Sequence, residues 1–158
     1  MEITLRERTA DTVKIYFDKA QSPEIKKTLP QKAKSVKEAM ADFEKTQLPG
    51  ATSFGQTIYV NDMYVGDVWC YCMDPDGEPN CMISYCIFRT EFWSQGIATR
   101  AVALFLETIR EKFSVATVGA FIYSDHAASL RVLRKNGFTI LEEFVEEDLR
   151  SVYLQRNY

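Results

Sequence analysis

The chain has 158 residues, of which 46% are hydrophobic, and a formal net charge of -3. This length and apolar content predict a single domain over residues 1–158 whose core needs no metal or disulfide. The charge is spread without a basic stripe, which excludes the composition typical of nucleic-acid-binding proteins. No apolar run approaches the roughly 18 residues of a membrane span, and Met1-Glu2-Ile3-Thr4 lacks a signal pattern, so a cytoplasmic protein without membrane contact is expected.

The first third of the chain has the pattern of one strand followed by three helices. Ile3 and Leu5 alternate with polar residues, as in a half-buried strand. Two helix starts carry clear signals, because Ser22-Pro23-Glu24 places proline in a first turn and Ser35-Val36-Lys37-Glu38 is a capping box. The elements expected are a strand at 2–6 and helices over 9–20, from 23 until Pro30, and from 36 until Leu48-Pro49-Gly50.

From Gly55 the pattern changes to strands. Asn61-Asp62 predicts a hairpin turn and Asp74-Pro75-Asp76-Gly77 a second turn. The second string resembles the start of a calcium loop, but the remaining ligand positions are missing, so a turn is predicted. Gly137 is placed to end a helix in the left-handed conformation. The elements expected are strands at 57–60, 63–73 and 81–88, a helix at 98–113, a strand at 115–123, a helix at 127–136, and a hairpin of 138–144 with 149–155.

The four cysteines raise the question of a zinc site. Cys70 and Cys72 should share one face of a strand, whereas Cys81 and Cys86 are separated by an odd number and should face opposite sides of theirs. Four thiolates therefore do not converge easily. Reduced, partly buried thiols are predicted in place of a metal site, and no metal is expected elsewhere.

The segment with the most chemical content joins a predicted strand to a predicted helix, and residues 91–101 read EFWSQGIATRA. Gly96, Ala98 and Thr99 are small, so backbone N–H groups at the helix start can approach another molecule closely. A helix start also carries partial positive charge, which favours a phosphate or pyrophosphate. Tight packing of helix on sheet, or a nucleotide such as ATP or NAD, remain alternatives for the same residues.

A second block follows one strand later, where residues 124–138 read SDHAASLRVLRKNGF. Together the two blocks resemble the GCN5-related N-acetyltransferase (GNAT) superfamily, in particular its ribosomal-protein alanine acetyltransferases. The acetyl-CoA loop of these proteins commonly reads W-G-K-G-x-A-T-E-A, similar to residues 93–101. Their later helix commonly reads N-x-x-S-x-x-x-x-x-K-x-G-F, similar to residues 126–138. The resemblance implies an α/β (α+β) domain with a mixed, mostly antiparallel, twisted sheet flanked by helices.

The resemblance also implies acetyl-CoA as co-substrate. It places the pyrophosphate on the backbone of residues 95–99, with Trp93 and Ser94 at the approach, and the pantetheine arm along residues 87–89. It places Ser129 near the thioester sulfur. The basic residues of the later helix, Lys135 among them, either meet the CoA phosphates or are solvated. The cofactor-binding residues predicted are Ile87, Phe88, Arg89, Trp93, Ser94, Gln95, Gly96, Ile97, Ala98, Thr99, His126, Ser129, Arg131 and Arg134.

The chain departs from the family pattern at the positions that transfer protons. Met82 stands where relatives often have a glutamate base, and Leu133 where many members have a tyrosine acid. His126 stands where the family has asparagine, and three roles are open for it: a contact to the cofactor arm, a general base, or a helix cap or surface residue. The candidate catalytic residues are therefore Ser129 and His126.

The amine acceptor is left open among a protein N-terminus, a polyamine, an amino acid and a small amine drug. In the resembling family, the region corresponding to residues 21–54 shapes the acceptor site, although ordinary helical cover is the alternative here. The acidic run 142–148 either attracts a cationic amine or is a solvated hairpin. The sequence is compatible with a homodimer without specifying one. Aromatic residues that either line the acceptor pocket or belong to the core are Tyr64, Trp69, Tyr71 and Tyr85.

These observations predict an acyl-CoA-dependent N-acetyltransferase that works by direct attack of a primary amine in a ternary complex. Alignment of two bound reactants supplies about 7 to 11 kcal/mol in favourable cases, so modest acid and base groups suffice. The alternative is a degenerate member that binds CoA without turnover, since both usual proton-transfer groups are replaced.

Overall fold

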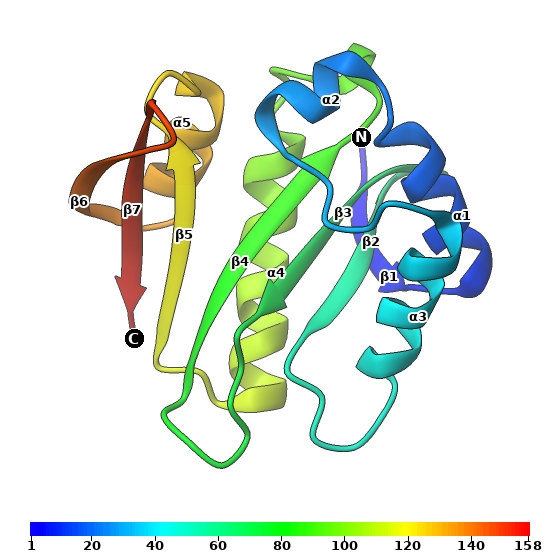
Figure 1. Ribbon diagram of the computed structural model, residues 1–158, viewed down its shortest axis with the longest axis horizontal. Helices are drawn as coiled ribbons and strands as arrows, with labels where there is room; N and C mark the ends of the chain where they lie inside the picture. Colours follow the sequence, from blue (N-terminus) through cyan, green and yellow to red (C-terminus); the bar gives the residue numbers. More distant parts are fainter.

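One sheet of seven strands runs through the computed structural model, which describes residues 1–158 (Figure 1). The strands are β1 (Ile3–Glu7), β2 (Phe54–Val60), β3 (Met63–Tyr71), β4 (Asn80–Ile87), β5 (Thr117–Tyr123), β6 (Thr139–Glu146) and β7 (Leu149–Asn157). Their order across the sheet is β1-β2-β3-β4-β5-β7-β6, and every neighbouring pair is antiparallel except β4 and β5. The predicted mixed, mostly antiparallel sheet is confirmed.

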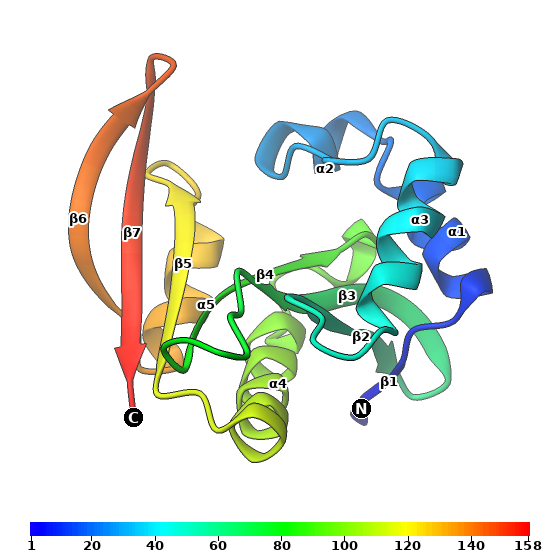
Figure 2. The same cartoon turned by 60° about the horizontal axis from the view of Figure 1, so that its bottom comes forward.

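Five helices flank this sheet on its two faces (Figure 2). They are α1 (Ala10–Lys19), α2 (Pro23–Thr28), α3 (Val36–Thr46), α4 (Ile97–Phe113) and α5 (Ala127–Lys135). Helices α4 and α5 cover one face, and α1 to α3 lie on the other. No helix is both long and apolar enough to cross a membrane.

Most element boundaries follow from local signals in the sequence. The Ser35 hydroxyl accepts a 3.1 Å hydrogen bond from the backbone N–H of Glu38, as the capping box predicts. The reciprocal half differs, because the Glu38 carboxylate accepts from the backbone N–H of Lys34, at 2.6 Å, and not from that of Ser35. Position 34 lies one residue before the cap, so the carboxylate ties down the chain that enters α3.

The end of α5 is a Schellman motif. Gly137 has φ 83°, its N–H donates to the carbonyl of Arg134, and the N–H of Phe138 donates to the carbonyl of Leu133. Both Leu133 and Phe138 are buried, which supplies the apolar contact that accompanies this motif. The predicted left-handed cap at Gly137 is confirmed.

The larger core lies between the sheet and helices α4 and α5, and Phe105 and Ile109 of α4 are among its fully buried members. A smaller cluster under α1 and α2 includes Ile25 and Phe88. Alternation along the strands assigns successive side chains to these two cores.

The cysteines divide between these cores and the surface. Cys81 joins the larger core and Cys86 the smaller one, as their odd separation predicts. The prediction that Cys70 and Cys72 share a face is wrong: β3 ends at Tyr71, and Cys72 turns outward with φ 58°, so it is exposed while Cys70 is buried. All four thiols are free, and no three His, Cys, Asp or Glu side chains are grouped to hold a metal ion.

The functional feature of the sheet is the short pairing between β4 and β5. Only residues 80–82 of β4 pair with residues 117–119 of β5. Beyond this point the two strands separate toward the end of the sheet where α2 and α5 lie on either side, and the unpaired space between them is called the slot (Figure 1). The slot interrupts the middle of an otherwise continuous sheet.

Candidate active site

A cleft of about 1670 Å³ occupies the slot between β4 and β5 and widens above it. One wall is formed by α2 and the end of β4, and the other by the end of β5, the start of α5 and the β6–β7 hairpin. Residues 96–99, at the start of α4, form part of its lining. The cleft therefore reaches both faces of the sheet and can hold two reactants from opposite sides.

The loop before α4 is built to present backbone N–H groups. Ser94 and Gly96 both have left-handed backbones, with φ 62° and 78°. The first intrahelical bond of α4 runs from the N–H of Arg100 to the carbonyl of Gly96, so the N–H groups of residues 97–99 have no acceptor within the helix. No side chain caps this end. A Cβ on Gly96 would meet nothing within 4 Å, which leaves the approach to these donors open.

Three hydrogen bonds hold this loop in place. The indole Nε1 of Trp93 donates to the carbonyl of Ile87 at 2.8 Å, which joins the loop to the end of β4. The Gln95 amide donates to the carbonyl of Glu91 at 2.7 Å. The buried amide of Asn136, at the end of α5, donates to the carbonyl of Thr99 at 3.1 Å. The free N–H groups of residues 97–99, called the N–H seat below, are thus fixed from both sides of the slot.

The start of α5 brings the two candidate catalytic residues together. Ser129 is buried, and its Oγ lies 3.5 Å from Nε2 of His126. The hydroxyl of Tyr85, on β4, donates to the carbonyl of Ser129 at 3.3 Å. The three residues line one region of the cleft, where β4 faces α5.

The protonation states in this region follow from burial. Partial burial lowers the pKa of His126, although the nearby Asp125 carboxylate opposes this shift, so the imidazole is neutral at neutral pH. Burial raises the pKa of Tyr85 to about 12, so its phenol remains a hydrogen-bond donor. The His126 side chain makes no capping bond to α5, and it is only partly exposed. A helix-capping role for this side chain is therefore not observed.

Most of the predicted cofactor residues line the cleft. They are Ile87, Trp93, Ser94, Gly96, Ile97, Ala98, Thr99, His126, Ser129 and Arg131. Lys135, named as an alternative phosphate contact, lines it too.

Four predicted cofactor residues lie outside the lining: Phe88, Arg89, Gln95 and Arg134. Phe88 faces the smaller core, with its ring 5.0 Å from that of Tyr64 in an edge-to-face arrangement. The Arg89 guanidinium donates to the carbonyl of Tyr64 at 2.8 Å, away from the slot. Of residues 87–89 only Ile87 lines the cleft, because strand alternation turns Phe88 to the opposite side and Arg89, beyond the end of β4, is held by Tyr64.

The four aromatic residues considered for an acceptor pocket also divide. Tyr85 lines the cleft. Trp69 packs edge to face against Tyr16 of α1, 6.0 Å between centroids, and Tyr64 belongs to the smaller core. Core membership therefore describes Trp69 and Tyr64, whereas Tyr85 lines the cleft and Tyr71 belongs to neither.

Ile25 of α2 and Leu29, which caps its end, form one wall and fall within residues 21–54, the region expected at the acceptor site. Sequence reasoning missed Phe121 and Tyr123 of β5, which form part of the other wall. Alternation in β5 places Phe121 and Tyr123 on one face, but it does not reveal that no helix covers this face. Asn136 carried no signal, because its role depends on a contact with Thr99, which is 37 residues away in the sequence.

Charge is unevenly distributed along the cleft. Helix α5 contributes Arg131 and Lys135, whereas the β6–β7 hairpin contributes three carboxylates, Glu142, Glu146 and Asp148, and one cation, Arg150. The basic side lies next to the free N–H groups of α4, and both favour an anionic group.

Comparison with known proteins places this geometry in a family. A family model described as an acetyltransferase (GNAT) domain matches residues 2–139. No curated protein sequence matches the chain.

Solved structures share the fold at low sequence identity. Spermidine N-acetyltransferase from Vibrio cholerae, in complex with CoA and spermine, has a TM-score of 0.86 at 12% identity, over 98% of this chain and 95% of that one. RimL, a ribosomal alpha-N-protein acetyltransferase in complex with coenzyme A, has a TM-score of 0.82 at 17% identity, over 98% of this chain and 93% of that one. The aminoglycoside acetyltransferase AAC(6')-Ib in complex with coenzyme A has a TM-score of 0.81 at 13% identity, over 99% of this chain and 95% of that one.

Proposed function

The chain belongs to the GNAT acetyltransferase family, and from this premise we propose that it transfers an acetyl group from acetyl-CoA to a primary amine. The reaction is direct attack by the amine in a ternary complex. The observation that carries this proposal is the open N–H seat at the start of α4, which leads into the slot between β4 and β5.

The residues of the cleft fit acetyl-CoA in three respects. The N–H groups of residues 97–99 suit the pyrophosphate, and the open space beside Gly96 allows its close approach. Arg131 and Lys135 supply positive charge on the same side. The slot beyond them, beside Ile87, is where the strands no longer hydrogen-bond to each other, so backbone groups are free to pair with the amides of a pantetheine arm.

The reaction requires two proton transfers. The lone pair of the amine attacks the thioester carbonyl carbon, the C–S bond breaks, the thiolate takes up a proton, and the nitrogen loses one. Ser129 supplies the proton to the departing thiolate, because its hydroxyl is buried at the end of the slot. His126 is neutral, and its Nε2 lies 3.5 Å from that hydroxyl. It can therefore hydrogen-bond to Ser129 and return a proton to the serine oxygen after Ser129 has protonated the thiolate.

The acceptor side of the cleft lies between α2 and the β6–β7 hairpin. The structural neighbours are a spermidine N-acetyltransferase with bound spermine, a ribosomal alpha-N-protein acetyltransferase and an aminoglycoside acetyltransferase. This range supports an amine acceptor as the general class. The resemblance of residues 93–101 and 126–138 to ribosomal-protein alanine acetyltransferases keeps a protein N-terminus among these acceptors.

A binding measurement followed by a turnover measurement tests the proposal. Thermal unfolding is recorded with acetyl-CoA, CoA, ATP and NAD, since a ligand that binds only the folded state raises the melting temperature. A rise with the CoA forms alone supports the seat at α4. A rise with ATP or NAD alone contradicts it. Release of free thiol from acetyl-CoA, dependent on an added amine, then supports the acetyltransferase.

A second function is favoured by one observation, the replacement of both usual proton-transfer groups by Met82 and Leu133. Leu133 is fully buried in the larger core, so it takes no part in chemistry. If CoA binds but no amine in a broad panel releases thiol, the protein is a CoA-responsive binding protein.

A further inference from the structure

Strands β5, β7 and β6 present one face to the cleft that no helix covers (Figure 2). The pairing register places Phe121 of β5 beside Tyr153 of β7, and Tyr153 beside Glu142 of β6. The next row along joins Tyr123, Ser151 and Phe144. Directly paired residues of antiparallel strands share a face, so these six side chains form one continuous surface.

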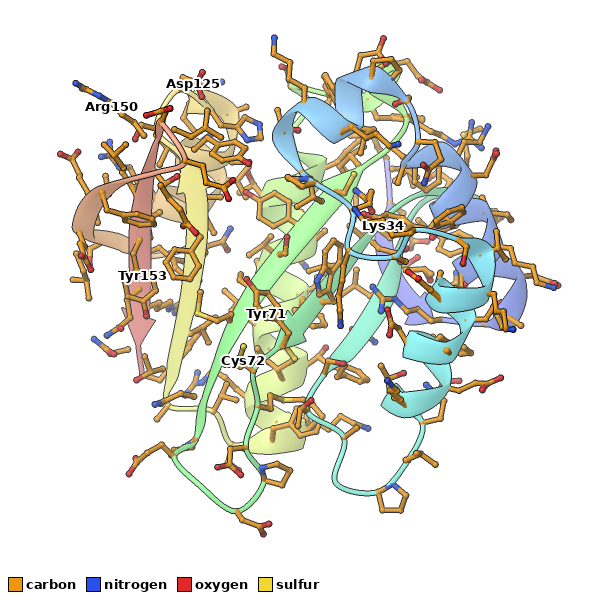
Figure 3. The ribbon with its side chains drawn as sticks, in the orientation of Figure 1. Lys34, Tyr71, Cys72, Asp125, Arg150 and Tyr153 are labelled. Carbon is orange, nitrogen blue, oxygen red and sulfur yellow. The ribbon has the colours of Figure 1, made fainter.

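The centre of this surface is aromatic. The ring of Phe121 lies 5.2 Å from that of Tyr153 and 5.8 Å from that of Phe144. Phe121 is nevertheless 56% exposed, although it lies in a concave region beside the slot. Phe121 and Phe144 line the cleft, and Tyr153 lies beside them. Exposed aromatic rings suit contact with an apolar chain or a cation, because the ring faces carry negative charge density. Figure 3 labels Tyr153 on this surface and Arg150 near the tip of the hairpin.

Carboxylates lie beside the aromatic centre, along β6 and at the tip of the hairpin. Glu142, Glu146 and Asp148 all line the cleft. The protein contains two salt bridges, Arg6–Asp62 and Arg8–Asp67, and neither involves these carboxylates. Their charge is therefore not neutralised by any cation within 4 Å. Three cations line the same part of the cleft, Arg150 from the hairpin and Lys26 and Lys27 from α2. The cations beside the cofactor seat, Arg131 and Lys135, lie on α5.

Resting on the acetyltransferase function, we propose that the acceptor is an aliphatic amine with at least one further ammonium group, as in a linear polyamine. The reacting amine enters the slot near Tyr85 as the free base. The carbon chain lies over Phe121 and Tyr153, and the second ammonium lies between the aromatic rings and the carboxylates of Glu142 and Glu146. The reaction joins the nitrogen to the acetyl carbon, breaks the C–S bond, releases CoA thiol, and leaves the second ammonium charged.

Three amines of equal chain length test this inference. Putrescine carries a second ammonium on its fourth carbon, n-butylamine carries only hydrogen there, and the fourth carbon of gamma-aminobutyrate is a carboxylate. The kcat/KM for amine-dependent thiol release should fall in this order, and spermidine should be accepted at least as well as putrescine. Added salt should lower kcat/KM for putrescine more than for n-butylamine, since it screens the carboxylates.

Matched variants locate the effect. The double variant Glu142→Gln/Glu146→Gln should lower kcat/KM for putrescine by roughly three- to thirty-fold, as expected for the loss of two exposed charge contacts, and leave n-butylamine nearly unchanged. Glu143→Gln is the control, because Glu143 pairs with Val152 on the opposite face of the same hairpin. Phe121→Leu keeps apolar area but removes the ring, and should reduce the preference for the diamine.

Different results would overturn the preference for a polycation and the acetyltransferase function itself. If n-butylamine is acetylated as well as putrescine, and Glu142→Gln/Glu146→Gln behaves like Glu143→Gln, the polycation inference is overturned and the acetyltransferase stands. If no amine releases thiol, the acetyltransferase function is overturned. Calorimetric titration of spermidine into the CoA-loaded protein then still tests the surface. Binding lost in the double variant supports it, and absence of binding overturns it.

Discussion

The phenol of Tyr85 on β4 donates a 3.3 Å hydrogen bond to the backbone carbonyl of Ser129 on α5. The two residues belong to opposite walls of the slot, which lacks backbone pairing at this level. The bond therefore links the walls of the cleft and positions the helix turn that carries Ser129 and His126.

Tyr85→Phe should reduce kcat several-fold, with a smaller change in KM for acetyl-CoA, because the helix turn at Ser129 loses its link to β4. The free energy of unfolding should fall by about 1 kcal/mol, the usual net contribution of one hydrogen bond. Steady-state kinetics and urea unfolding measure the two effects. Tyr71→Phe is the control, since the hydroxyl of Tyr71 makes no hydrogen bond and should leave kcat unchanged. Equal kinetic effects of the two substitutions would contradict a positioning role for Tyr85.

Gly96→Ala should weaken acetyl-CoA binding by about ten-fold or more, because the added methyl projects into the open space over the N–H groups of α4. It should also cost about 1 to 2 kcal/mol in backbone strain, since Gly96 has φ 78°. Gly50 provides a matched control, because it has φ 74° and a methyl group added there would likewise meet no atom within 4 Å. Gly50→Ala should show similar strain and normal CoA affinity. Calorimetric binding, with unfolding measured in parallel, separates the two contributions.

Asp67→Ala should destabilise the fold by about 3 to 5 kcal/mol, the usual effect of removing one partner of a buried ion pair. The Asp67 carboxylate accepts from Nε of Arg8 at 3.1 Å and from the hydroxyl of Tyr64, and its side chain is only 3% exposed. Asp62 forms the comparable pair with Arg6 at 3.0 Å, but its side chain is 98% exposed. Asp62→Ala should therefore cost less than about 1 kcal/mol. Denaturant unfolding of both variants measures the difference, and similar losses would contradict this assignment.

Protonation of His126 should make the fold less stable in acid. Burial lowers the pKa of His126 in the folded state, and Asp125 offsets part of this shift. The unfolded chain, with an ordinary histidine pKa of about 6.5, therefore binds the proton more tightly than the folded chain. Stability from this group is complete above pH of about 6.5 and is lost as pH falls toward the folded-state pKa.

His126→Asn removes this titration, so the variant should lose less stability than the parent protein between about pH 7 and pH 5. Thermal unfolding across this range measures it. The same variant also tests the catalytic role of His126, since retained kcat at neutral pH would exclude it from proton transfer. A steeper loss of stability in the variant would contradict the burial of the imidazole.

Local sequence signals predicted most elements to within a few residues. The proline after Ser22, the cap at Ser35 and the glycine at position 137 act through neighbours a few positions away, so their effects are visible in the sequence. The same holds for residues 93–99, where the small residues that open the helix lie within one loop. The family resemblance rested on this loop and on the α5 block, and both proved to line one cleft.

Long-range geometry decided the rest. The sequence around Phe88 and Arg89 shows a strand end, but only the pairing of Phe88 with Val65 reveals that these side chains turn away from the slot. The acceptor wall formed by β5 is likewise decided by tertiary structure, because alternation in β5 cannot show which face of the sheet lacks a helix. The cleft itself exists because β4 and β5 stop pairing after Met82 and Gly119. Such a separation depends on contacts between residues far apart in the sequence, whereas caps and turns depend only on the residues next to them.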